Sequence, residues 1–172
     1  MNKARDIYFF DTITSETVKN LIDGVIRYVD EDPNELITLY VSSAGGKYYA
    51  AQIFFEWVRL KQVSLQTFAL SSVNSAAILL YAAGTKRLAS ELADFYFHEM
   101  KRTFANQELD FRQLVEESED LSFLENKGLQ LIGGACGCTT DKLASLCQTS
   151  TRLTAYQAKE LGLVHEVVPL KP

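Results

Sequence analysis

The sequence predicts one α/β domain, residues 1–172, built on a largely parallel sheet. Its 172 residues are 47% apolar and 23% charged, which is the composition of a single compact globular domain. A chain of this length buries roughly 70% of its unfolded surface, so its core needs no disulfide or metal. Short apolar runs alternate with segments of helical periodicity along the whole chain, and that alternation is typical of a parallel sheet.

The first half of the chain reads strand, helix, strand, helix, strand. Thr14 or Ser15 is placed to cap the first helix, in which apolar residues recur every three to four positions. Pro33 marks the end of this helix, because the residue before a proline is pushed out of the helical region. The predicted elements are strands at 7–10, 36–41 and 63–69, helices at 15–30 and 48–60, and a loop at 42–46.

The second half continues the alternation, with no linker or repeat. Gly84 is placed to end an Ala- and Leu-rich helix that is apolar on most faces. Thr140 or Asp141 is expected to cap a short helix, and Thr154 with Gln157 forms a capping box for the last one. The predicted elements are helices at 75–83, 109–131, 140–147 and 154–162, and strands at 94–98 and 164–168.

The longest uncharged segment, 62–85, has the length of a membrane span but carries nine polar side chains. We therefore place it in the buried centre of a soluble domain, where its polar groups need partners or a purpose. The start of the chain shows no apolar segment followed by small residues. No signal peptide is visible, so the cytoplasm is the expected compartment.

Charge and cysteine content exclude several classes of function. Seventeen basic against twenty-two acidic side chains give a net charge of -5, so nucleic acid and anionic membranes are poor partners. Cys136, Cys138 and Cys147 have no fourth ligand close by, since the nearest histidine is His165. We interpret them as reduced, buried thiols, and no metal site is predicted.

Only two histidines are present to act as a general base near neutral pH, and His98 is the better placed. It ends a predicted strand, where a side chain can project into a cleft, whereas His165 lies in a terminal segment. Ser75 stands where a buried strand passes into a buried helix, a place where backbone N–H groups are unpaired. A plain helix N-cap is the alternative role for this serine.

A serine nucleophile also needs two N–H donors about 3 Å from the charge that develops on the substrate oxygen. Gly45 and Gly46 directly follow a predicted strand and allow the backbone to approach a ligand closely. The backbone of this glycine pair can supply one donor, and the N–H of Ala76, next to the serine, can supply the other. An ordinary strand-to-helix turn is the alternative for this glycine pair.

Taken in order, these motifs resemble the proteolytic subunit of the Clp protease, within the crotonase-like superfamily. The matching segments are 37–46 (ITLYVSSAGG), 75–84 (SAAILLYAAG), 86–87 (KR), 95–98 (FYFH) and 153–164 (LTAYQAKELGLV). The resemblance spans roughly residues 5–168. It implies the ClpP/crotonase-like fold, with repeated strand-helix units, a mostly parallel twisted sheet and a protruding handle helix.

The resemblance implies a serine-type endopeptidase that hydrolyses peptides through an acyl-enzyme. Ser75 is then the nucleophile and His98 the general base, while the N–H groups of Gly46 and Ala76 form the oxyanion hole. No cofactor is implied. A ring-shaped homo-oligomer, a heptamer or double ring, is expected by the same resemblance. Five aromatic residues crowd the helix at 48–60, which favours a subunit contact unless that helix is sandwiched within its own chain.

The main departure from the family is Ser150, which stands where the family carries the Asp of the catalytic triad. Losing that carboxylate costs about four orders of magnitude in rate, roughly 5 kcal/mol, unless another group orients the imidazole. Ser150 or Thr149 offers only a weak substitute. Glu99 is expected on the other face of the strand, and Asp94 lies about 13 Å back along it.

Two further departures concern binding and assembly. Glu99 and Met100 replace a Gln-Pro pair that leads into a glycine-containing strand, which in the family helps to bind the peptide and join rings. The chain also begins almost at its first core strand, without the segment that lines the axial pore in the family. Coupling to an ATPase unfoldase is therefore not implied.

Two other functions remain open. A ring-forming structural or regulatory subunit with little activity is favoured by the missing acid and by the altered strand after His98. An acyl-CoA enzyme of the same superfamily is suggested by the closing segment, 153–164, although the usual additional acids and length are absent.

Overall fold

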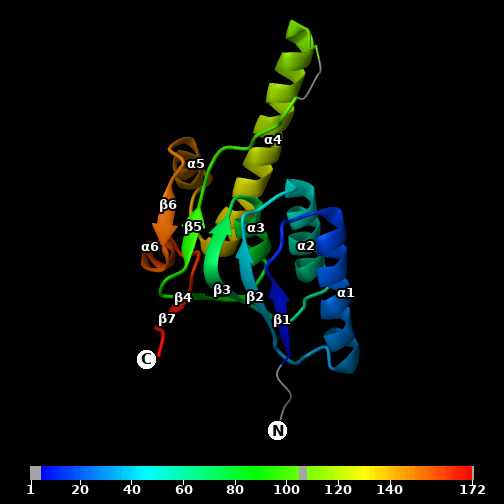
Figure 1. Cartoon of the computed structure of the whole chain (residues 1–172), viewed down its shortest axis with the longest axis vertical. Helices are drawn as coiled ribbons and strands as arrows, with labels where there is room; N and C mark the ends of the chain where they lie inside the picture. Colours follow the sequence, from blue (N-terminus) through cyan, green and yellow to red (C-terminus); the bar gives the residue numbers. More distant parts are fainter. Residues whose placement is uncertain (1–4, 105–107, 172) are drawn as a thin grey trace.

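The computed structural model describes residues 5–104 and 108–171, which form a head with a seven-stranded sheet and a long helix projecting from it (Figure 1). The strands are β1 (Asp6–Phe9), β2 (Ile37–Ser43), β3 (Leu65–Asn74), β4 (Lys86–Ser90), β5 (Asp94–Tyr96), β6 (Arg152–Thr154) and β7 (Glu166–Val168). The helices are α1 (Ser15–Glu31), α2 (Tyr48–Leu60), α3 (Ala76–Ala82), α4 (Phe111–Cys136), α5 (Thr140–Gln148) and α6 (Ala155–Glu160).

The sheet is mostly parallel, as predicted. The order β1-β2-β3-β4-β7 contains only parallel pairs, and β5 pairs parallel with β3 and antiparallel with β6. Helix α4 is the protruding helix that the family resemblance implies. The predicted α/β fold class is therefore confirmed.

Strand β3 changes its neighbour half-way along its length. Residues from Gln66 to Ala69 pair with β4, whereas residues from Ser72 to Asn74 pair with β5. The register against β2 shifts between these two halves. Because of this change, the end of β3 lies beside the strand that leads to His98.

Helix α3 is fastened to the sheet by buried hydroxyl groups. Residues from Ala77 to Ala82 are all buried. The Tyr81 hydroxyl donates to the Leu88 carbonyl at 2.9 Å, and the Thr67 hydroxyl donates to the Tyr81 carbonyl at 2.8 Å. These bonds partner polar groups of the uncharged segment 62–85. Most of this segment is buried, as predicted, although Gln62, Leu70, Ser71 and Thr85 are exposed.

The helix boundaries confirm two predicted caps and correct a third. Thr14 caps α1, and Thr154 forms a capping box with Gln157 at the start of α6. Helix α5 is capped by Thr139, so the prediction of Thr140 or Asp141 is wrong by one or two residues. Helix α4 also continues past 131, because its last turns pack against the core through buried apolar and glycine residues: Leu129, Ile132 and Gly133.

Two strands escaped the sequence prediction. Strand β4 carries Arg87 in the core, where its guanidinium donates to the carbonyl oxygens of Leu163, Gly84, Ala135 and Gly162. A buried arginine breaks the apolar pattern that marks a strand. Strand β6 has three residues, too few to show any period.

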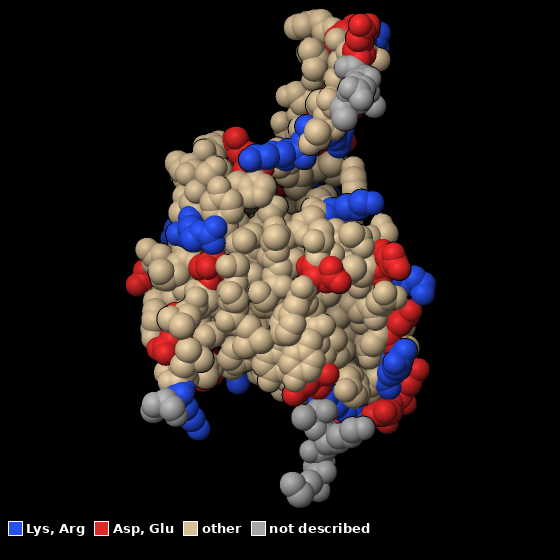
Figure 2. All heavy atoms as spheres, viewed as in Figure 1, with Lys and Arg blue, Asp and Glu red and all other residues tan. Residues whose placement is uncertain are grey.

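Most of the aromatic residues of α2 pack within the chain. Phe54 and Phe55 are buried and Trp57 packs against the core, whereas Tyr49 is 54% exposed. The alternative of a sandwiched helix therefore accounts for most of this cluster. Charged side chains are dispersed over the head and α4 on the face drawn in Figure 2. Within the described part of the chain, no helix combines the length and apolar character needed to span a bilayer.

Candidate active site

Ser75 lies in a strained turn between β3 and α3. Its φ is 56° and its ψ is -128°, a conformation that costs a residue other than glycine about 1–3 kcal/mol. Its N–H donates to the Tyr96 carbonyl at 2.9 Å, which ties the turn to the end of β5. The side chain makes no capping hydrogen bond to α3. The plain N-cap role that the sequence left open is therefore not adopted.

His98 follows β5, and a backbone contact defines its tautomer. Its Nδ1 lies 2.7 Å from the carbonyl oxygen of Glu99. A carbonyl oxygen can only accept, so Nδ1 carries a proton and the lone pair of the neutral ring is on Nε2. The imidazole also lies beside the Tyr96 ring, with 5.5 Å between centroids. This tautomer is the one a general base needs.

The glycine pair after β2 lies against the serine turn. A Cβ added to Gly45, whose φ is 98°, would stand 2.9 Å from the Ser75 Cβ. Gly46 is bridged to Ile13 through bonds that use the Gly45 carbonyl and the Lys47 N–H. The N–H of Gly46 takes no part in that pairing. Only glycine fits at either position, because the φ of Gly46 is 144° and a Cβ there would meet the Ile13 backbone.

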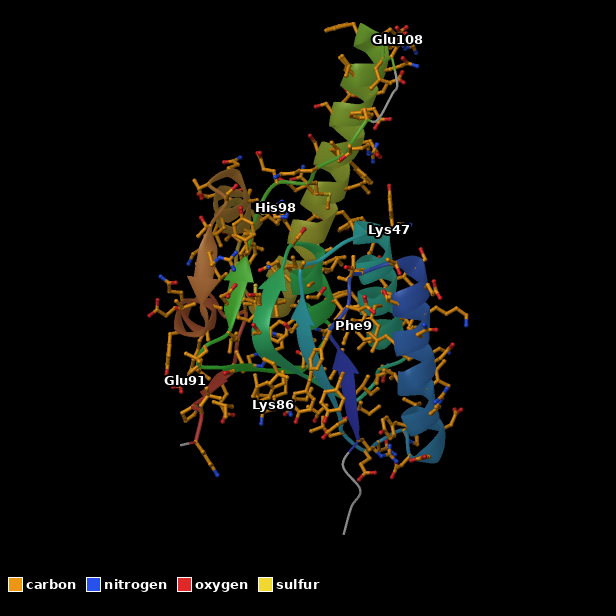
Figure 3. All side chains as sticks on the ribbon, viewed as in Figure 1. Phe9, Lys47, Lys86, Glu91, His98 and Glu108 are labelled. Carbon is orange, nitrogen blue, oxygen red and sulfur yellow. The ribbon has the colours of Figure 1, made fainter. Side chains whose placement is uncertain are left out.

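A single pocket, with a cavity volume of about 750 Å³, brings four of the five predicted site residues together. Ser75, Ala76, Gly46 and His98 all line it. Figure 3 shows His98 and Lys47 at the end of the head from which α4 projects. Much of the remaining wall is apolar and comes from α3 and α4, including Ile78, Leu79, Leu121, Leu124, Leu129 and Ile132.

Ser150 is not among the residues that line the pocket. The pairing of β5 with β6 extends through the Phe97 N–H, which donates to the Thr151 carbonyl at 2.9 Å, so Ser150 comes next along the chain. Its side chain is exposed, and Thr149 and Thr151 hydrogen-bond to each other at 2.7 Å. The place of the family's acid therefore holds hydroxyl groups and no carboxylate.

Of the two acids nearest to His98 in sequence, Asp94 is engaged by other side chains and the carboxylate of Glu99 is exposed. Asp94 accepts from the Ser72 hydroxyl at 3.0 Å and forms an ion pair with Arg152. The Arg152 guanidinium lies over the Tyr96 ring. The Glu99 side chain is exposed, and only its backbone carbonyl contacts the imidazole.

The segment after His98 is tied to α4. The Met100 N–H donates to Glu125 Oε2 at 2.7 Å, and Arg102 forms ion pairs with Glu117 and Asp120. Residues 97–104 contain no strand, in agreement with the departure seen in the sequence. Sequence reasoning missed Glu125. The only available signal was its place next to Leu124, on the face of α4 that packs against the head.

The cysteines only partly match the prediction. Cys147 is buried and lines the pocket, while Cys136 and Cys138 are partly exposed, so the prediction of three buried thiols is wrong for two of them. Burial, and then the charges of Glu125 and Glu99, raise the pKa of the Cys147 thiol to about 12. Cys147 is therefore protonated and a poor nucleophile near neutral pH.

The second histidine, His165, is hydrogen-bonded to the backbone of strand β4. The His165 Nδ1 accepts from the Arg87 backbone N–H at 3.1 Å. Burial, and then the charges of Arg87 and Lys86, lower the pKa of its imidazole. In the described ranges no three His, Cys, Asp or Glu side chains gather as metal ligands.

The comparison with known families covers nearly the whole chain. The model of the Clp protease family matches residues 1–171. The chain belongs to the Clp protease family. Members of this family are serine peptidases, and the coarse prediction of a hydrolase is confirmed at that level.

Three relatives show how far the similarity extends. The ATP-dependent Clp protease proteolytic subunit 1 of Corynebacterium jeikeium is 24% identical, over 96% of this chain and 88% of its own. A Clp protease proteolytic subunit-like protein of Streptomyces coelicolor is 29% identical, over 95% and 78%. The proteolytic subunit 1 of Shouchella clausii is 22% identical, over 98% and 86%. Identity this low supports the family without assigning individual residues.

The close approach of Gly45 to the serine turn gives a first test. Gly45→Ala should lower the free energy of unfolding by about 1–3 kcal/mol, because the new Cβ overlaps the turn and φ is positive. On the proposal made below that Ser75 is the nucleophile, its labelling by a fluorophosphonate should also fall at least about tenfold, because the serine is displaced. Gly134→Ala on α4, where a Cβ meets nothing, is the control: it should leave labelling unchanged and raise the free energy of unfolding by up to about 1 kcal/mol, because alanine favours a helix interior over glycine. Urea titration and labelling rates measure both, and unchanged labelling in Gly45→Ala would contradict the packing argument.

Proposed function

We propose that this chain is a serine endopeptidase that forms its acyl-enzyme on Ser75 with His98 as general base. The observation that carries the proposal is the shared pocket, which both side chains line while the Ser75 hydroxyl is free of any capping bond. The Nδ1–H tautomer of His98 supports it, because Nε2 then has the lone pair that accepts the serine proton. Membership of the Clp protease family supports the same chemistry.

In the proposed mechanism, Ser75 Oγ attacks the carbonyl carbon of the scissile peptide while His98 Nε2 takes its proton. The N–H groups of Gly46 and Ala76 stabilise the oxyanion of the tetrahedral intermediate. His98 then returns the proton to the leaving amine, and the acyl-enzyme remains. Water, deprotonated by the same imidazole, hydrolyses that ester and restores the free serine.

A ring-forming subunit with little activity is the second candidate. The observation that favours it is the set of hydroxyl groups, Thr149, Ser150 and Thr151, at the position of the family's acid. In well-studied triads, loss of the carboxylate that orients the imidazole lowers the catalytic rate by about four orders of magnitude. Reactivity of the serine distinguishes the two candidates.

A fluorophosphonate probe tests the proposed nucleophile. The native protein should be labelled, Ser75→Ala should not, and His98→Ala should react at least about a hundredfold more slowly, because general base catalysis supplies that much. Ser71→Ala, an exposed serine earlier on β3, is the matched control and should label like the native protein. Native labelling no greater than that of Ser75→Ala, under conditions that label a known serine peptidase, would leave the low-activity subunit as the function.

We also propose that the subunits assemble into a closed homo-oligomeric ring. Exposed apolar side chains on α4 support a contact with another copy: Phe111 is 83% exposed, Phe123 is 66% exposed and Leu114 is 50% exposed. Apolar surface of this kind on a projecting helix is typical of an interface. The relatives' description as subunits of a protease is consistent with assembly.

Light scattering at micromolar concentration tests the ring. The native mass should be a multiple of the 19.3 kDa subunit mass. Phe123→Asp should lower that mass, because it places a charge in the expected contact, whereas Leu170→Asp, also at an exposed residue, should not. A native protein whose measured mass is that of one subunit, 19.3 kDa, would refute the assembly.

A further inference from the structure

One peptide group connects His98 to a carboxylate of α4. The Glu99 carbonyl accepts from His98 Nδ1 at 2.7 Å, and the Met100 N–H donates to Glu125 Oε2 at 2.7 Å. That carbonyl and that N–H belong to the same planar peptide unit. Imidazole, peptide and carboxylate therefore form a continuous chain of hydrogen bonds.

Such a chain carries the polarising effect of the carboxylate to the imidazole. A carboxylate that accepts from an amide N–H forms a charge-assisted bond, which is stronger than a bond between neutral groups. This bond polarises the amide and makes the carbonyl at its other end a better acceptor, since linked hydrogen bonds strengthen one another by about 10–30% each. The carbonyl then holds the Nδ1–H tautomer more firmly and stabilises the imidazolium that forms during proton transfer.

We propose that Glu125 is the positioning residue that replaces the absent triad acid, acting on His98 through the peptide group between Glu99 and Met100. The catalytic meaning of this assignment rests on the proposed function. The link between the carboxylate and the imidazole does not, because it can be measured without turnover. The link also needs the N–H of Met100, which a proline at this position would lack.

The other acids near His98 are less well placed for this role. Asp94 is engaged by Ser72 and Arg152, and the Glu99 carboxylate is exposed to solvent. Glu125 is partly buried and lines the pocket, where charges are screened less than on the surface.

Three cations share the pocket with Glu125 and His98. Lys47 comes from the start of α2, and Lys101 and Arg102 follow the histidine. Arg102 is already paired with two acids of α4. Of the neutral titratable groups, Cys147 and Tyr48 have pKa values raised to about 12, first by burial. They stay uncharged through a histidine titration. The charges of these neighbouring groups therefore stay constant while His98 titrates, and an effect of a Glu125 substitution can be assigned to the loss of its carboxylate.

The first experiment follows the ring protons of both histidines by NMR as a function of pH in the full chain. Glu125→Gln keeps an acceptor oxygen but removes the charge, which disfavours the imidazolium, so the titration midpoint of His98 should move to lower pH. His165 is an internal reference and should not move. Glu119→Gln, an exposed acid on the same helix, is the matched control for the loss of one charge.

A second pair of variants tests the peptide link and leaves Glu125 intact. Met100→Pro removes the donor N–H and should move the His98 midpoint in the same direction, while Met100→Ala keeps the N–H and should not. This pair stands in for Glu125→Gln should that variant fail to fold. A His98 midpoint that stays at its native value in folded Glu125→Gln or Met100→Pro would overturn the proposal.

Peptide hydrolysis then separates this proposal from the proposed function. In Glu125→Gln, kcat/KM should fall about tenfold or more, and the acidic limb of its pH profile should shift with the NMR midpoint. Ser150→Asp, which restores an acid at the family's position, should recover activity in that variant. If the His98 midpoint moves in the variants as predicted, but the native protein is not labelled and does not hydrolyse peptide, the link between Glu125 and His98 is retained. Only the proposed function is then contradicted. Equal loss in Glu125→Gln and Glu119→Gln would overturn the assignment of Glu125.

Discussion

The hydrogen bond from the Ser75 N–H to the Tyr96 carbonyl holds together the two strands that carry the proposed catalytic pair. It forms because β3 leaves β4 after Ala69 and continues beside β5. Without that change of neighbour, Ser75 and His98 would lie at the ends of strands that do not touch. The same bond holds the serine turn in its strained conformation, and the strain is offset by the buried packing of α3.

Several elements that are distant in sequence line the pocket. The glycine pair after β2 lies against the serine turn. Residues of α3 and apolar residues of α4 line much of the remaining pocket. Tyr48 touches α4 at Gly128, where a Cβ would stand 2.9 Å from its ring. Helix α4 therefore lines the proposed active site and also carries the apolar side chains of the expected contact between subunits. That double role links the site to assembly.

The electrostatics of the site depend on what orients the imidazole. In a standard triad a carboxylate contacts Nδ1 directly, and here a backbone carbonyl takes that position. A neutral carbonyl fixes the tautomer but stabilises the imidazolium less than a charge does. The carboxylate of Glu125 accepts a hydrogen bond from the N–H of the same peptide group and polarises it. Activity is therefore expected to be lower than in a full triad and higher than in a serine-histidine pair with no acid.

Much of this arrangement could be predicted from sequence, and the failures have physical causes. Apolar spacing located α1, α2 and α4 because one face of each packs on the core, whereas Ser75 and Gly46 were singled out by the order of motifs that the chain shares with the family. Strand β4 was missed because Arg87 is satisfied by carbonyl groups distant in sequence. Glu125 was missed for the same reason, since its partner lies 25 residues away along the chain. Contacts of this kind leave no local pattern.

Mapping the adduct of a peptidyl chloromethyl ketone tests the pairing of Ser75 with His98 most directly. Such a reagent forms a hemiketal with an active serine and alkylates the adjacent histidine on Nε2. Mass spectrometry of the digested native protein should place the alkyl group on His98, and Ser75→Ala should lose most of it. Alkylation of Cys147 or His165 in its place, or none at a concentration that modifies a known serine peptidase, would contradict the pairing.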